Sequence, residues 1–311
     1  MMNAKQTWRG SIKGWLYVMP MLIVIVVFSI YPIIKSFAMS LYTDYQFLTD
    51  TVLARGFDNF SYLFSDTNFH LAVANTLVYV VGTVPLTIVI SLILAVMLFH
   101  IKKFADFFRT VYFLPFVTST IAISMVWTWI FNARLGLANY FLSVIGVSPI
   151  DWLNDPKYAM LTLIIISIWK GLGFNIILIL AGLGNIDKRY ANAAKVDGAN
   201  AWQIFWHVTL PQLSPTLVFV LINAVIGDFK VFDEVFAVFG GQPGPAQSAM
   251  TMVFYIYQQF YVMNQYGRAA AAAVILFAMI LVVTIIQLLV SRHFDYSRPT
   301  KVKRTKKKAK A

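Results

Sequence analysis

The sequence contains no cysteine among its 311 residues. This absence excludes disulfide bonds, thiolate catalysis and cysteine-ligated zinc or iron–sulfur sites. It also leaves the redox environment of the protein undetermined.

Charged residues are scarce as well. Only 12% of the residues are Asp, Glu, Lys or Arg, whereas 59% are hydrophobic, and the mean hydropathy is +0.71. A water-soluble domain would carry about 25% charged residues. A lipid bilayer is therefore the expected surrounding, and helices of about 20 apolar residues are expected to cross it, because a helix satisfies its own backbone hydrogen bonds.

Groups typical of catalysis are few. The four histidines, His70, His100, His207 and His293, do not have the spacing of metal ligands. No nucleophile with a neighbouring base stands out either. The phosphate-binding pattern G-x-x-x-x-G-K-S/T does not occur in the sequence, so we expect that this chain does not hydrolyse ATP itself. We expect no metal, cofactor or catalytic residue in it.

Six apolar stretches are long enough to cross the bilayer as helices. They lie at about 14–37, 71–99, 108–132, 157–182, 212–237 and 267–292. The first is too long for the apolar region of a signal peptide and lacks a small-residue cleavage site, so we expect it to remain uncleaved. The predicted fold class is therefore all-α, a polytopic membrane protein with six transmembrane helices over residues 14–292.

Basic residues alternate between the connecting segments. They concentrate in residues 1–13, in the connections that follow the second and fourth stretches, and in the tail 293–311, whereas the other connections are rich in Asp. The positive-inside rule places both termini in the cytoplasm. This topology and contact of the tail with lipid explain the net charge of +12, so we expect no nucleic acid partner.

The cytoplasmic connection 184–211 is long enough to have structure of its own. Asp187 is a plausible N-cap for a helix over 188–196, and Gly198 can adopt the left-handed conformation that ends it. A second short helix follows, with Ala201, Ile204, Phe205 and Val208 on one apolar face, and Pro211 is expected to end it. Spacing alone leaves two interpretations open: a partner-docking element, or an amphipathic loop on the headgroups.

The residues of this segment resemble the EAA loop of binding-protein-dependent ABC importer permeases, with Asn192 in place of the leading Glu. The matching positions are Asn192, Ala193, Ala194, Asp197, Gly198, Ala199, Phe205, Leu210 and Pro211. Phe229-Lys230-Val231-Phe232-Asp233 and Gly240-Gly241-Gln242-Pro243 resemble signals of the carbohydrate-uptake branch, the maltose-permease-like large subunit.

The resemblance implies a type I ABC importer transmembrane domain in a bacterial inner membrane. It implies four kinds of partner: a second homologous permease subunit, two cytoplasmic ATPases with ATP-Mg, an extracytoplasmic solute-binding protein, and the lipid bilayer. The EAA loop would dock on an ATPase and transmit its closure. The expected function is uptake of a sugar or oligosaccharide.

The solute path is expected on the helices that flank the EAA loop, where the resemblance and buried polar groups point to it. The candidates are Ser167, Trp169, Lys170, Gly171, Phe174, Asn175, Asn223 and Asp228. For Lys170 and Asp228, solute contact and a purely structural role stay equally open. Lys230 and Asp233 are expected to form a structural ion pair, and His70 and Asn75 to be packing groups.

Two other classes of function remain as alternatives. A secondary active transporter of small polar solutes would also have buried charges, but it often shows repeated halves, which the sequence does not display, and needs no ATPase-docking loop. A membrane enzyme would need a catalytic cluster that the sequence lacks. The sequence does not identify the solute.

Overall fold

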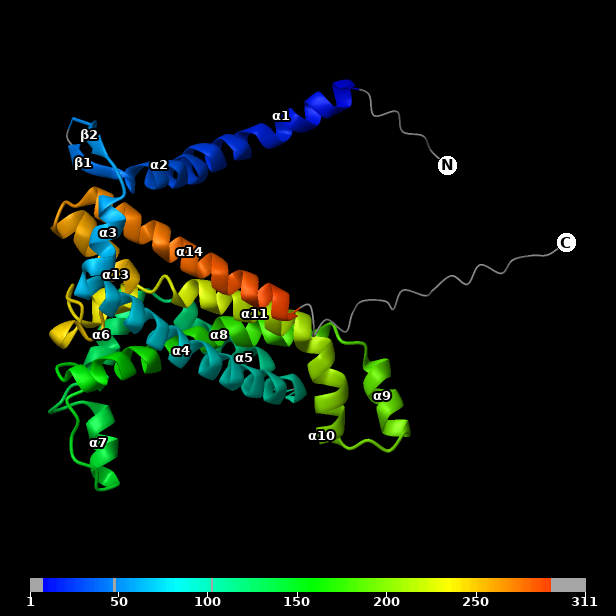
Figure 1. Ribbon diagram of the computed structural model, residues 1–311. Coiled ribbons are helices and arrows are strands. Elements are labelled where there is room, and N and C mark those ends of the chain that lie inside the picture. Colours follow the sequence, from blue (N-terminus) through cyan, green and yellow to red (C-terminus); the bar gives the residue numbers. More distant parts are fainter. Residues whose placement is uncertain (1–7, 47–48, 102, 292–311) are drawn as a thin grey trace, which may run out of the picture. The chain divides into compact units, whose positions relative to one another are not determined.

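The computed structural model describes residues 8–46, 49–101 and 103–291 (Figure 1). The predictions for the basic tail 293–311, and for most of the N-terminal segment 1–13, therefore concern residues outside the described part of the chain. The described chain is mainly helical. Its elements are α1 (Trp8–Ile25), η1 (Val26–Ile30), α2 (Tyr31–Met39), β1 (Tyr42–Gln46), β2 (Thr51–Arg55), α3 (Asp58–Ser65), α4 (Thr67–His100), α5 (Ala105–Val117), α6 (Thr120–Ile130), α7 (Leu137–Val144), α8 (Pro156–Gly184), α9 (Lys188–Val196), α10 (Ala201–Ile204), η2 (Phe205–Thr209), α11 (Leu210–Asp228), α12 (Asp233–Val238), η3 (Pro245–Gln247), α13 (Met252–Tyr257), η4 (Gln258–Val262) and α14 (Tyr266–Ser291).

Five helices of the described chain are long and apolar enough to cross a membrane. They are Gly14–Met39, Thr67–His100, Pro156–Gly184, Ala201–Asp228 and Tyr266–Ser291. A sixth candidate is a helix pair, Asp106–Val117 with Thr120–Ile130, bent by 98°. The described chain therefore has five candidate spans, and the predicted six if this pair counts as one broken span.

The third span differs from the single helix predicted over 108–132. Thr118 and Ser119 both leave the helical conformation, with ψ of 148° and 126°. The Thr118 hydroxyl donates to the Leu114 carbonyl at 2.7 Å, which takes up an acceptor of the last turn of α5. Hydropathy cannot show such a break, because it depends on composition alone.

The fifth span also ends earlier than predicted. Instead of reaching residue 237, α11 stops at Asp228. A four-residue break follows, and Asp233 begins the separate short helix α12. The charged residues between 228 and 234 therefore lie at a helix end and in a loop, where backbone and side chains can line a cavity.

One compact unit comprises the residues up to 73 together with 252–278. It holds an antiparallel hairpin, in which Tyr42 pairs with Arg55 and Gln46 with Thr51. The prediction of an all-α chain missed these two short strands. The Asn59 amide donates to the carbonyls of Ser40 and Tyr42, at 3.0 and 2.9 Å, and so ties α3 to the start of the hairpin.

The same unit contains a second set of buried contacts. The Tyr255 hydroxyl donates to the Asp66 carboxylate at 2.6 Å, and Phe69 packs edge-on against the Tyr255 ring. On the surface of this unit, the exposed His70 contacts the Phe64 carbonyl through Nε2 at 2.9 Å. This local contact fits the expectation that His70 is a packing or interface group.

The other unit comprises residues 74–251 and, in the described part of the C-terminal helix, residues 279–291. Its apolar core is formed by α4, α8 and α11 and consists of Ala95, Leu98, Ile176, Ile179, Leu180, Leu183, Leu213 and Val220. Glycines let the helices approach closely: a Cβ on Gly173 would collide with the Tyr112 carbonyl of α5, and one on Gly182 would lie 2.8 Å from Leu213 of α11. Asn75 donates its amide to the carbonyls of Gln247 and Met250, and is thus a packing group as predicted.

Candidate functional site

The loop between α8 and α11 begins with a capped helix. The Asp187 carboxylate accepts the Arg189 N–H at 2.9 Å and the Arg189 Nε at 2.7 Å. The Arg189 hydrogen bond lowers the pKa of the Asp187 carboxyl. The predicted N-cap and the predicted helix over 188–196 are both confirmed.

The turn after α9 requires a glycine. Gly198 has φ +83°, in the left-handed region. The Ala199 N–H donates to the Ala194 carbonyl at 2.9 Å and the Gly198 N–H to the Lys195 carbonyl at 3.1 Å, which is the Schellman pattern of a helix C-terminus. The prediction for Gly198 is confirmed.

The second helix starts with a capping box that we did not predict. The Asn200 side chain accepts the Gln203 N–H at 2.9 Å, and the Gln203 side chain accepts the Asn200 N–H at 2.8 Å. Two amide donors that the helix leaves unpaired are satisfied in this way. The sequence signal was present, as an Asn followed three residues later by a Gln.

The expectation that Pro211 ends this helix is wrong. Helix α10 continues through the π-helical turn η2 into α11, so that Ala201–Asp228 is one helix of 28 residues. Within it the Leu210 N–H donates to the Phe205 carbonyl, five residues back. This wider turn directly before Pro211 accommodates a ring that would clash with the carbonyl of a regular α-helix.

Figure 1 shows α9 and α10 as a helical hairpin beyond the ends of α8 and α11. Large apolar side chains are exposed on it, namely Tyr190, Val196, Trp202 and Trp206, and Val196 has an exposed fraction of 88%. Of the predicted loop residues, Asn192, Ala193, Asp197 and Gly198 are exposed, and Ala194, Ala199, Phe205 and Pro211 are half-buried. The hairpin therefore offers an apolar surface with small residues at its turn.

A second polar region lies at the other end of α11. Lys170 of α8 donates to the Glu234 carboxylate at 2.7 Å and to the Thr120 hydroxyl at 2.6 Å. The side chains of Lys170 and Glu234 are only 19% and 16% exposed. This ion pair joins α8, α12 and the start of α6, and the sequence did not indicate Glu234 or Thr120.

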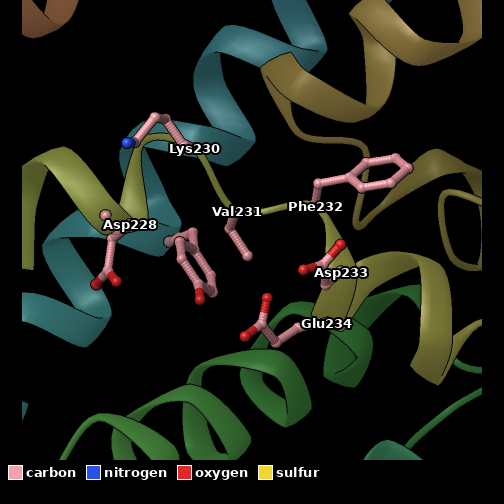
Figure 2. A pocket seen from close by; sticks show the side chains of 8 residues that line it. Asp228, Lys230, Val231, Phe232, Asp233 and Glu234 are labelled. Carbon is pink, nitrogen blue, oxygen red and sulfur yellow. The ribbon is translucent and has the colours of Figure 1, made fainter. Parts of the chain in front are cut away.

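A cavity of about 180 Å³ lies beside this pair. Tyr79, Gly227, Asp228, Lys230, Val231, Phe232, Asp233 and Glu234 line it. Figure 2 shows that the Lys230 side chain extends away from the carboxylates of Asp233 and Glu234. Among the described ion pairs there is none between Lys230 and Asp233, so the prediction of a structural Lys230–Asp233 pair is wrong. The ion pair found in this region joins Lys170 to Glu234.

Only Asp228 among the predicted path residues lines this cavity. Ser167 lies behind it and accepts the Tyr79 hydroxyl at 2.6 Å. The others make structural contacts: the Trp169 ring packs edge-on against Trp127, and Phe174 stacks on Phe116 at 4.8 Å. No sequence signal pointed to Tyr79, which comes from the distant helix α4.

The remaining candidates lie apart from the cavity lining. Asn175 is buried, at 5% exposure. Asn223 is exposed and donates its amide to the Phe219 carbonyl one turn back, at 2.9 Å. Gly171 faces Thr87 of α4, to which an added Cβ would approach within 3.3 Å.

These features define a multi-pass membrane permease with an exposed helical hairpin on the connection between two of its spans. The sequence matches the binding-protein-dependent transport system inner membrane component family over residues 87–296, and the chain belongs to this family. It is accordingly an inner membrane protein, of the permease type found in ABC importers.

Its relatives extend over almost its whole length. The chain is 37% identical over 286 residues to a lactose transport system permease protein of Rhizobium radiobacter, with 91% of this chain and 95% of that protein covered. It is 36% identical over 299 residues to an arabinooligosaccharides transport system permease protein of Bacillus subtilis, with 94% of each covered. A trehalose/maltose transport system permease protein of Thermococcus litoralis is 31% identical over 291 residues, covering 94% of this chain and 97% of that protein.

Solved structures share the fold. A chain of a bacterial ABC transporter involved in the import of the acidic polysaccharide alginate has a TM-score of 0.78 and 26% identity, with 93% of this chain and 99% of that chain covered. A chain from a bacterial alginate ABC transporter in complex with an alginate pentasaccharide-bound periplasmic protein has a TM-score of 0.81 at 24% identity, and covers 94% of this chain and 99% of that chain.

Proposed function

We propose that this chain is the membrane permease subunit of an ATP-driven importer for a sugar or oligosaccharide. It forms half of the translocation pathway together with a second, homologous permease subunit. Two cytoplasmic ATPases bind and hydrolyse ATP-Mg, and an extracytoplasmic binding protein delivers the solute. Both termini and the hairpin α9–α10 face the cytoplasm, as the distribution of basic residues indicates.

The observation that carries this proposal is the continuous helix Ala201–Asp228. At one end it presents Trp202 and Trp206, both exposed, and at the other end Asp228 lines the cavity. A helix of this length spans about 42 Å. A displacement of the hairpin by a closing ATPase can therefore be carried to the cavity along one continuous helix.

The cavity itself supports the idea of a shared pathway. Its volume of about 180 Å³ is below the range of about 300–1,000 Å³ that is usual for ligand pockets. A second permease subunit facing it would enlarge the space. Carbohydrate uptake is supported by the three relatives, whose names all specify saccharides.

The coupling role is tested by Gly198→Leu. A bulky residue at φ +83° strains the turn between α9 and α10 and obstructs docking of the ATPase. In vesicles that hold the importer with its copurifying partners, we expect solute uptake to fall at least about tenfold, and ATP hydrolysis to become independent of solute or to be lost with the ATPase.

Gly146→Leu is the matched control. Gly146 also has positive φ, +78°, and open space around an added Cβ, but it lies in the loop after α7. Gly136, directly before α7, would not serve as a control position, because an added Cβ there would collide with the Asn132 and Ile130 carbonyls. Normal transport by an assembled Gly198→Leu complex would contradict the coupling role.

Removal of the ATPases distinguishes the importer from a secondary active transporter, which the comparisons do not support. Vesicles with the two permease subunits alone should take up no solute under an ion gradient. Uptake driven by such a gradient would contradict the proposed function.

A further inference from the structure

The cavity at the end of α11 has an unequal balance of charge. Three carboxylates line it, from Asp228, Asp233 and Glu234, against one lining ammonium, from Lys230. The charge of Glu234 is neutralised by Lys170, whose Nζ lies 2.7 Å from the Glu234 carboxylate. Lys170 itself does not belong to the lining. The Lys230 side chain extends away from Asp233 and Glu234 (Figure 2). Among the described ion pairs there is none with Asp228 or Asp233, and the half-buried Asp228 carboxylate accepts a hydrogen bond from the Thr83 side chain. The lining therefore carries more carboxylates than ammonium groups.

The rest of the lining is mainly polar. Tyr79 and Phe232 are its aromatic residues, but Tyr79 is only 2% exposed, and its hydroxyl donates to Ser167. Hydroxyl groups of a neutral saccharide are hydrogen-bond donors that carboxylates accept well, whereas a sugar carboxylate would meet like charges.

The shared fold does not decide this question. The structurally similar transporter described as importing alginate takes an acidic polysaccharide, so the same architecture can serve anionic solutes. In this chain the cavity lining has three carboxylates and one ammonium group.

We propose that this cavity admits neutral saccharides and rejects carboxylate-bearing ones, and that Asp228 is the residue that sets this selectivity. Asp228 lines the cavity at the end of the helix that reaches the coupling hairpin. Movement of that helix would therefore change the position of Asp228 relative to the solute. The inference rests on the proposed function, from which it takes the identity of the cavity as part of the solute path.

The absence of cysteine from the sequence permits a direct measurement of cavity charge. Gly227 lines the cavity, and an added Cβ there meets no atom within 4 Å. Gly227→Cys can be modified with a cationic reagent, 2-(trimethylammonium)ethyl methanethiosulfonate, and an anionic one, 2-sulfonatoethyl methanethiosulfonate, in membranes that hold the assembled importer. Loss of the free thiol is read on this chain after separation by mass.

The control position is Ser148→Cys, a near-isosteric change at an exposed residue of the loop after α7. We expect the ratio of cationic to anionic modification rates to be at least about tenfold higher at residue 227 than at residue 148. Asp228→Asn, which removes the charge and keeps the shape, should lower the ratio at residue 227 at least about threefold and leave that at residue 148 unchanged.

Three results would overturn the proposal: equal ratios at the two positions, a ratio at residue 227 that Asp228→Asn does not change, or a thiol at 227 that neither reagent reaches. If Gly227→Cys prevents assembly of the complex, Phe232→Cys is the second reporter, since Phe232 lines the cavity and is only half-buried. The same three results apply to it.

Uptake separates this inference from the proposed function. Vesicles containing the importer and its copurifying partners are given ATP and radiolabelled lactose, arabinotriose or maltotriose as neutral probes, and digalacturonate as the anionic probe. We expect the uptake rate of digalacturonate to be below about one tenth of the rate for the best neutral probe. In Asp228→Asn this ratio of digalacturonate uptake to neutral uptake should be higher. Rapid digalacturonate uptake by the unaltered importer overturns the charge selectivity alone, whereas no ATP-dependent uptake of any neutral probe counts against the proposed function.

Discussion

The two ends of the helix Ala201–Asp228 are stabilised in different ways. At the hairpin end the contacts are local: Asp187 caps α9, Gly198 makes the turn, and Asn200 caps α10, each through groups within a few residues. At the cavity end the contacts join distant segments, as Lys170 reaches Thr120 and Glu234, 50 and 64 residues away. The comparison indicates that the hairpin can move as a preformed body, whereas the cavity wall depends on the packing of the whole unit.

The largest expected effect on stability is at the cavity end. Glu234→Gln leaves Lys170 with an unpaired charge in a largely buried position, and the loss of one partner of such a pair costs about 3 kcal/mol. The apparent Tm of the purified complex in detergent should fall by several degrees. Asp50→Asn, which breaks the exposed Lys35–Asp50 pair at 3.2 Å, is the control and should change it little. Equal shifts in the two variants would contradict the difference between the two ends.

A smaller effect is expected where α8 meets α5. In Gly173→Ala the added methyl group collides with the Tyr112 carbonyl, and such overpacking costs about 1–3 kcal/mol. Gly184→Ala, at the end of the same helix with no atom within 4 Å of the new Cβ, should leave the apparent Tm unchanged. A tolerated methyl group at 173 would show that α5 and α8 are not in tight contact in the membrane.

The smallest effect on stability is expected at the hairpin. Asn200→Ala removes the capping box of α10, which costs about 1 kcal/mol locally. Because no residue of the buried apolar core lies in α9 or α10, the apparent Tm should change little, while solute-stimulated ATP hydrolysis should fall. Asn200→Ser, which retains a capping oxygen, should recover most of that activity, and a lowered Tm in Asn200→Ala would contradict the independence of the hairpin.

The sequence was informative where contacts are local. Helix α9, its cap at Asp187 and the turn at Gly198 were all predicted, because each signal lies within the element that it shapes. The Asn200 capping box has an equally local signal that was overlooked. Pro211 was misinterpreted, because the π-helical turn before it is visible only in the hydrogen bonding of the folded helix.

The cavity could not be predicted in the same way. Tyr79, Lys170 and Glu234 come from three helices, and no spacing rule relates them. Of the positions transferred from the family resemblance, Ser167 and Phe174 of α8 make packing contacts, with Tyr79 and Phe116. Charge and hydropathy located the membrane spans, but only tertiary packing determines which polar groups share a cavity.

The bend of 98° between α5 and α6 has a consequence for biosynthesis. The two helices have 13 and 11 residues, so each extends about 20 Å or less and neither can cross hydrocarbon of about 30 Å alone. Their partners, α8 and α12, are synthesised after them. We therefore expect the insertion machinery to retain this segment until the later helices emerge, so that the third span enters the bilayer only after the fourth and fifth.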